Sequence, residues 1–186
     1  KSSEAYFGRG WARAGKGDAK ESILDFTKAI KLNPQHGMAY MLRGEAYRAN
    51  SKIDKAIADF TKAIEIKSDY VYAYYQRGRS YNNKNQFTKA IDDFNMVLKI
   101  EPKAGEWIYV NRGWAYYKKN MLAEALADYN KAIEMNPKPA ESYLSRGLVF
   151  GEKGELDKAL ADNTQAISIN PKYSEAYRSR ADVHHL

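Results

Sequence analysis

The chain has 186 residues and a formal net charge of +7, with 44% hydrophobic and 28% charged residues. This composition supports a packed core and excludes a disordered tail, while the absence of cysteine excludes disulfides, thiolate metal sites and cysteine nucleophiles. No apolar run approaches the roughly 20 residues that span a bilayer, and the positive charge permits acidic partners or nucleic acid without indicating either.

An Arg-Gly pair recurs along the chain at intervals of 34, 34, 35 and 34 residues. Its copies are Arg9-Gly10, Arg43-Gly44, Arg77-Gly78, Arg112-Gly113 and Arg146-Gly147, and a sixth begins as Arg180-Ala181. A tyrosine stands three residues before each arginine, at Tyr6, Tyr40, Tyr74, Tyr109, Tyr143 and Tyr177. Sixteen residues after each glycine come Phe26, Phe60, Phe94, Tyr129 and then Asn163. A fixed period of this length indicates a repeat architecture.

Each repeat is predicted to form two helices joined by a short polar turn. We expect one domain over residues 1–186, with repeats at about 3–36, 37–70, 71–105, 106–139 and 140–173. In the second repeat, the apolar residues at offsets 0, 3, 4, 7, 10 and 11 from Ile53 share one helix face. Prolines end most second helices, at Pro34, Pro102, Pro137 and Pro171. Residues 174–186 form either a capping helix or the first helix of a truncated sixth repeat. The start at Lys1 instead of a methionine indicates a mature or excised piece.

Recurring small and charged positions predict how the two helices of a repeat meet. Glycine and alanine let the helix backbones approach closely, and the aromatic residues fill the space that remains. An aspartate recurs in every complete repeat, at Asp25, Asp59, Asp93, Asp128 and Asp162. Because a guanidinium fork matches a carboxylate, we expect each repeated arginine to pair with an aspartate of its own or the adjacent repeat. The alternative is a row of cationic sites for an acidic ligand.

This pattern resembles the tetratricopeptide repeat (TPR) family over residues 3–186, in a form that contains Arg-Gly. The resemblance implies an all-α fold, a right-handed superhelical α-solenoid of antiparallel helix pairs. Its first helices would line a concave groove that binds a peptide or a partner helix, so the chain is expected to be an interaction scaffold and not an enzyme. The departures from the pattern are Arg13, Ser22, Ser68, Asn163 and the inserted Gly105. Atypical end repeats suit the capping of a solenoid.

First-helix positions that do not face the core are expected to form the partner-binding groove. The candidate residues are Phe7, Trp11, Met38, Met41, Leu42, Tyr72, Tyr75, Arg79, Trp107, Asn111, Trp114, Tyr117, Leu144 and Leu148. Most are apolar or aromatic, and a contiguous exposed patch of this kind usually marks a binding surface. We therefore expect a protein or peptide partner of apolar or amphipathic character. The alternatives are that some of these residues pack within the scaffold, or that the groove is filled by another copy of the chain.

One known use of the family does not fit these residues. Family members that bind chaperone tails grip a C-terminal carboxylate with lysine, asparagine and arginine side chains on successive first helices. The corresponding positions here are Phe7, Trp11, Leu42, Tyr72 and Gln76, and shifting the alignment by whole repeats supplies only Asn111. We therefore expect no carboxylate-clamp partner.

Nucleic acid is the main rival ligand, since Tyr72, Tyr75, Trp107, Trp114 and Tyr117, with Arg79 and Lys118, resemble a stacking platform for single-stranded bases. Against it, Glu4, Glu45 and Glu141 balance the charge of the groove, and the excess lysines fall on second helices and turns.

Residues for catalysis or metal binding are not apparent in the sequence. The three histidines, His36, His184 and His185, lack the spacing of a helical metal site, and Gly15-Lys16-Gly17 lacks the strand and the Gly-Lys-Ser/Thr of a phosphate loop. We expect no metal and no cofactor.

Overall fold

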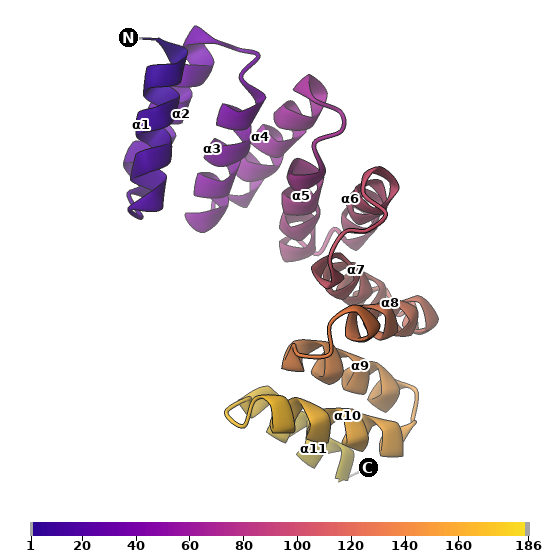
Figure 1. The fold of residues 1–186 in the computed structure, drawn as a ribbon. Coiled ribbons are helices and arrows are strands. Elements are labelled where there is room, and N and C mark those ends of the chain that lie inside the picture. Colours follow the sequence, from indigo (N-terminus) through magenta and orange to yellow (C-terminus); the bar gives the residue numbers. More distant parts are fainter. Residues whose placement is uncertain (1, 185–186) are drawn as a thin grey trace. The chain divides into compact units, whose positions relative to one another are not determined.

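The computed structural model describes residues 2–184, so predictions that concern Lys1, His185 and Leu186 lie outside the described residues. Within residues 2–184 the protein contains eleven α-helices and no strand (Figure 1). The helices are α1 (Ser3–Gly15), α2 (Ala19–Leu32), α3 (Gly37–Ala49), α4 (Ile53–Ile66), α5 (Val71–Asn83), α6 (Phe87–Ile100), α7 (Glu106–Lys118), α8 (Leu122–Met135), α9 (Ala140–Glu152), α10 (Leu156–Ile169) and α11 (Ser174–His184). The prediction of an all-α fold built from helix pairs is confirmed.

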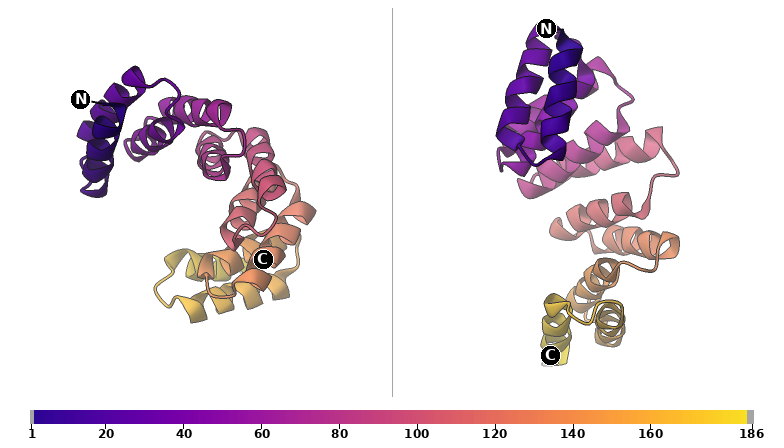
Figure 2. Two further views of the ribbon diagram at one scale, coloured as in Figure 1. Left: turned by 45° about the horizontal axis from the view of Figure 1, so that its top comes forward. Right: turned by 60° about the vertical axis from the view of Figure 1, so that its left-hand side comes forward.

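The chain divides into two compact units, Lys1–Pro102 and Lys103–Leu186, which are described separately. The N-terminal unit holds the pairs α1/α2, α3/α4 and α5/α6, and the C-terminal unit holds α7/α8 and α9/α10 followed by α11; Figure 2 shows these helices from two further directions. Neighbouring first helices also touch within each unit: α1 contacts α3, α3 contacts α5, α7 contacts α9, and α9 contacts α11. The single domain and the exact repeat limits stay predictions.

The turn inside each helix pair contains one residue in the left-handed backbone conformation. Gly17 and Gly154 occupy this position in the first and last pairs, with φ of 83° and 73°, whereas Ser51, Asn85 and Asn120 occupy it in the others with φ of 57–59°. Glycine adopts this conformation without steric cost and asparagine tolerates it, but serine is strained there. The turn therefore has the same geometry in all five pairs despite three different residue types.

The repeated glycines lie against buried aromatic rings, as the sequence predicts. A Cβ on Gly44 would stand 2.7 Å from Cε1 of Phe60, which has no exposed surface. Similar distances separate Gly10 from Phe26, Gly78 from Phe94 and Gly113 from Tyr129, at 2.9, 2.8 and 3.0 Å. In these four pairs the first helix therefore approaches the second so closely that a methyl group would meet the ring.

Each of the five complete repeats contains the expected Arg–Asp pair, always within its own repeat. The arginine Nε donates to one carboxylate oxygen and Nη2 donates to the other, at distances of 2.6–2.9 Å. The pairs are Arg9–Asp25, Arg43–Asp59, Arg77–Asp93, Arg112–Asp128 and Arg146–Asp162. These arginines therefore fix the two helices of a repeat against each other and do not form a row of cationic ligand sites.

Four of these arginines also lie between two aromatic rings of their own helix. The guanidinium carbon of Arg43 stands 5.5 Å from the centre of the Tyr40 ring and 5.8 Å from that of Tyr47. Arg77, Arg112 and Arg146 have the same arrangement. The rings at positions three before and four after each arginine thus supply cation–π contacts.

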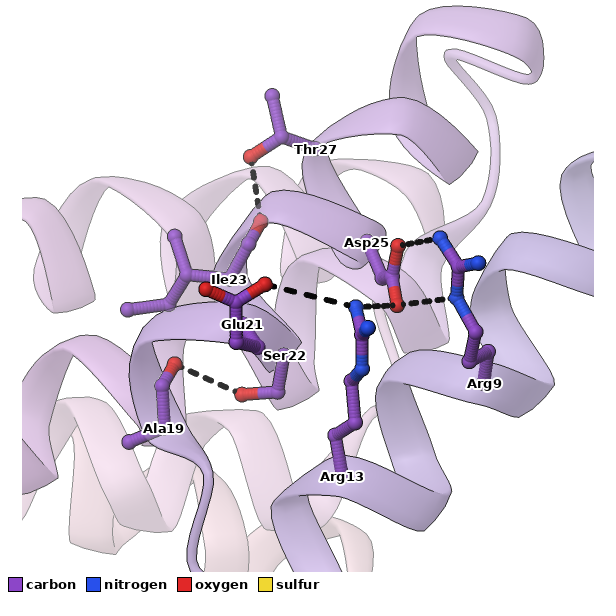
Figure 3. A network of polar contacts seen from close by, with 8 residues as sticks. All are labelled: Arg9, Arg13, Ala19, Glu21, Ser22, Ile23, Asp25 and Thr27. Atoms are coloured by element: carbon purple, nitrogen blue, oxygen red, sulfur yellow. Dashed lines mark hydrogen bonds and ion pairs between the residues drawn. The ribbon is translucent and has the colours of Figure 1, made fainter.

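The first repeat replaces the second ring with a second cation, Arg13. Its Nη1 donates to Oδ2 of Asp25 at 2.6 Å, so Asp25 accepts from both Arg9 and Arg13 (Figure 3). The hydrogen bond from Arg9 holds the pKa of the Asp25 carboxyl below its usual value, although burial opposes the shift. The departure at Arg13 therefore reinforces the ion pair of the terminal repeat.

Candidate partner-binding surface

Exposed apolar side chains gather on the first helices. Here the term first-helix surface means the predicted groove residues of α1, α3 and α5 in the N-terminal unit and of α7 and α9 in the C-terminal unit. Five of these residues are large, apolar and 36–64% exposed: Trp11, Met38, Tyr72, Trp107 and Trp114. Among the described residues, the other large exposed apolar side chains are Leu24, Leu32 and Met135 on second helices and Tyr177 on α11. The first helices therefore carry all the exposed tryptophans.

Two predicted groove residues do not lie on an accessible surface. Met41 of α3 is 5% exposed and Leu144 of α9 is 7% exposed. Leu144 belongs to a core cluster with Ala140, Ala166 and Ala176. The expectation that these two side chains line an open groove is corrected, because both are buried within the packed helices. Both side chains therefore stabilise the scaffold and are not positioned to contact a partner.

Phe7, Leu42, Tyr75, Arg79, Asn111, Tyr117 and Leu148 are half-buried. Phe7 packs its ring 6.0 Å from that of Phe26 and 4.6 Å from that of His36. It therefore combines a core contact with partial exposure. His36, the one histidine in an inter-repeat turn, takes part in this packing.

A polar network links α3 and α5 in the N-terminal unit. The Tyr72 hydroxyl donates to Oε1 of Glu45 at 2.7 Å, and Nε2 of Gln76 donates to the same carboxylate oxygen at 3.0 Å and to the Tyr72 hydroxyl at 2.7 Å. Burial raises the pKa of Tyr72, and the carboxylate of Glu45 adds to the shift. Gln76 is buried, and no hydrogen bond to its Oε1 is present among the described residues. The network holds the half-exposed Tyr72 ring in one position.

Aromatic and sulfur contacts complete this part of the surface. The Tyr70 hydroxyl donates to Sδ of Met38 at 2.9 Å. The centres of the Tyr72 and Tyr75 rings are 6.4 Å apart, and the guanidinium of Arg79 lies 5.4 Å from the centre of the Tyr75 ring. Arg79 is thus engaged by an aromatic ring.

The C-terminal unit presents a second aromatic group on α7. The Trp114 and Tyr117 rings are 5.8 Å apart, and the Lys118 ammonium lies 5.2 Å from the centre of the Trp114 ring. The Tyr117 hydroxyl donates to Oε1 of Glu152 on α9 at 3.3 Å. One turn earlier, Asn111 donates to the backbone carbonyl of Trp107 at 2.8 Å.

A pocket of about 330 Å³ opens beside Tyr117 in the same unit. Its walls come from the first helices α7 and α9 and from α11. The lining residues are Tyr117, Gly147, Leu148, Gly151, Glu152, Ser179, Asp182 and Val183. Sequence reasoning missed this pocket; its only signal was the unusual Asn163.

The described residues contain no group of three or more His, Cys, Asp or Glu side chains placed to hold a metal ion. Among the helices described here, none is both long and apolar enough to span a bilayer.

Comparisons with known families agree with the helix pairs. Models described as tetratricopeptide repeat match residues 3–36, 71–104, 107–139 and 128–161, and a model described as TPR repeat matches residues 44–83. The chain belongs to the TPR family. Membership of this family supports a role as a protein-interaction scaffold. A search of curated proteins gives no match to the chain.

Several solved TPR structures share the fold. A TPR protein from Parabacteroides merdae superposes with a TM-score of 0.87 at 22% identity, over 98% of this chain and 72% of that one. MamA from Desulfovibrio magneticus gives 0.86 at 16% identity, over 92% and 97%. YrrB, described as a TPR protein with an unusual peptide-binding site, gives 0.72 at 24% identity, over 86% and 82%. At these identities the likeness concerns the fold alone.

Proposed function

We propose that this TPR protein binds a peptide or a partner helix on its first-helix surface, and that the partner is apolar or amphipathic. The observation that carries the proposal is the exposure of Trp11, Tyr72, Trp107 and Trp114 on first helices. Aromatic side chains of this size dominate the binding energy of interfaces, because they bury a large area with few rotatable bonds. A binding role, and not a catalytic one, is also general for the family.

The polar groups beside these rings favour an amphipathic partner over a uniformly apolar one. Glu45 accepts from both Tyr72 and Gln76, and Lys118 covers one face of Trp114. Charged groups at the rim of an apolar contact orient a partner and select against wrong ones. The similarity in fold to YrrB, which is described as having an unusual peptide-binding site, supports this proposal.

A pull-down from the source organism tests the proposal with a matched control. The site variant Trp11→Ala/Trp114→Ala removes one exposed ring from each unit. The control variant Leu24→Ala/Met135→Ala removes one exposed apolar side chain per unit from second helices. We expect wild type and control to retain the same partner and the site variant to lose it. Equal capture by all three proteins would refute the placement of the binding surface.

The same experiment separates the rival ligands. Capture that falls steeply between 50 and 200 mM salt, at about the slope expected for several phosphate contacts, would indicate nucleic acid instead of an apolar peptide. Mass in solution that rises with concentration in wild type but not in Trp11→Ala/Trp114→Ala would indicate that the surface is filled by another copy.

A further inference from the structure

The fifth repeat lacks the aromatic ring that fills the other four. Phe26, Phe60, Phe94 and Tyr129 are buried below the glycine of their repeat, whereas Asn163 stands at the fifth position with no exposed surface. Asparagine is smaller than any of these rings. Its Nδ2 donates to Oγ of Ser179 on α11 at 2.9 Å, so the side chain turns towards α11. The volume that a ring occupies in the other repeats is therefore not filled by Asn163.

The 330 Å³ pocket of the C-terminal unit lies beside this position, although Asn163 itself is not one of its lining residues. Gly147 and Ser179, which both adjoin the Asn163 side chain, line the pocket. Oδ1 of Asn163 stands 3.0 Å from the position that a Cβ would take on Gly147, and it has no hydrogen-bond partner among the described residues. A buried acceptor without a partner is costly, and it lies directly behind the pocket wall.

The charged side chains that line this pocket are both carboxylates. Glu152 and Asp182 line it, and both side chains are exposed. None of the described lining residues is basic. Burial raises the pKa of Tyr117, and the neighbouring Glu152 carboxylate raises it further, in keeping with a negative local field. Leu148, Gly151 and Val183 supply the apolar part of the wall.

We propose that this pocket, here called the Asn163 pocket, binds a basic side chain of the partner. Lysine and arginine combine an aliphatic stem with a cationic head, so the stem would lie against Leu148 and Val183 while the head meets Glu152 and Asp182. The inference rests on the proposed function, because it names one residue class that the peptide or partner helix must carry. It adds a charged determinant to a surface that the sequence predicts to be apolar.

Small analogues of the two basic side chains test the pocket without knowledge of the partner. The amide signals of the ¹⁵N-labelled protein are followed by NMR during titration with n-butylguanidinium, n-butylammonium and the uncharged n-butylurea. We expect the cations, and not the urea, to shift the amides of Leu148, Gly151 and Val183. Tighter binding of n-butylguanidinium would identify arginine as the occupant, and tighter binding of n-butylammonium would identify lysine.

Two variants and one matched control establish the cause. Glu152→Gln/Asp182→Asn removes the two carboxylates and should weaken binding of the cation at least tenfold, as expected for the loss of charge-assisted hydrogen bonds. Asn163→Phe restores the ring of the other repeats and should abolish binding by filling the pocket. Glu124→Gln/Asp157→Asn removes the same charge from exposed positions on α8 and α10 and should leave binding unchanged.

Three results would overturn the inference: no shift with either cation, equal shifts with n-butylurea, or equal weakening by the control variant. The pull-down separates this failure from failure of the proposed function. If Asn163→Phe still captures the partner that Trp11→Ala/Trp114→Ala loses, the first-helix surface binds the partner and the pocket does not. If Asn163→Phe loses the partner that Trp11→Ala/Trp114→Ala still captures, the pocket binds the partner and the proposed surface fails.

Discussion

Gly44 provides a direct test of how closely the paired helices approach. Alanine at this position would place a Cβ 2.7 Å from Cε1 and 2.9 Å from Cδ1 of the fully buried Phe60 ring. Overpacking of this kind costs about 1–3 kcal/mol, while alanine favours the helix over glycine by about 1 kcal/mol. The expected net effect of Gly44→Ala is therefore a loss of about 0–2 kcal/mol in the free energy of unfolding.

Gly8 of α1 is the matched control, because a Cβ there has nothing within 4 Å. Gly8→Ala should gain about 1 kcal/mol from helix propensity alone, so the two variants should differ by about 1–3 kcal/mol. Thermal unfolding followed by circular dichroism measures the difference, at roughly 2–4 °C per kcal/mol for a chain of this size. If Gly44→Ala stabilises the protein as much as Gly8→Ala, the ring below Gly44 is not confined and the packing account is wrong.

Three further predictions concern the ion pairs and the turns. Arg77→Lys removes a bidentate pair with Asp93 and two ring contacts, and it should lower the free energy of unfolding by about 1–3 kcal/mol. Arg9→Lys should lower it less, because the Arg9 side chain is 42% exposed and Arg13 also binds Asp25. Equal losses of the two variants in urea unfolding would contradict this. The folded-state pKa of Asp25 is lowered, so its contribution to stability is present above the unfolded pKa and is lost as the pH falls through the folded-state pKa. In Arg9→Ala, NMR titration should show that the pKa of Asp25 rises. An unchanged pKa would count against the ion pair. Ser51→Gly should raise the free energy of unfolding by up to about 1 kcal/mol, because glycine accepts the positive φ without strain. Ser68→Gly, the same change at an exposed residue without a positive φ, should not raise it, and urea unfolding of both variants measures the difference.

The repeated features of the fold were predictable because each is set by a local rule that the period displays five times. The helix pairs follow from the spacing of apolar residues, and the Arg–Asp pairs follow from two residue types that recur 16 positions apart. The tyrosines three residues before and four residues after Arg43 are visible in the sequence. Their role as cation–π partners is not, because it depends on the direction of the side chains.

The candidate site was less predictable, because it depends on contacts between first helices that are distant in sequence. Met41 and Leu144 have the same apolar character as the exposed Met38 and Trp114, and only their burial in the folded structure distinguishes them. Asn163 appeared in the sequence as a departure from the aromatic position. The pocket beside it is lined by residues of α7, α9 and α11, and neither this lining nor the hydrogen bond from Asn163 to Ser179 can be read from the periodicity.

The central claim is that the first helices carry the partner-binding surface, and affinity measurement tests it most directly. Once the captured partner is known, its dissociation constant is measured by titration calorimetry with wild type, Trp11→Ala/Trp114→Ala and Leu24→Ala/Met135→Ala. Loss of two exposed interface rings should weaken binding by at least about tenfold, since truncation of an anchoring aromatic typically costs more than 1 kcal/mol. The dissociation constant of the second-helix variant should stay within about twofold of the wild-type value. Weaker binding by the second-helix variant with unchanged binding by the tryptophan variant would place the partner on the second helices and contradict the proposed surface.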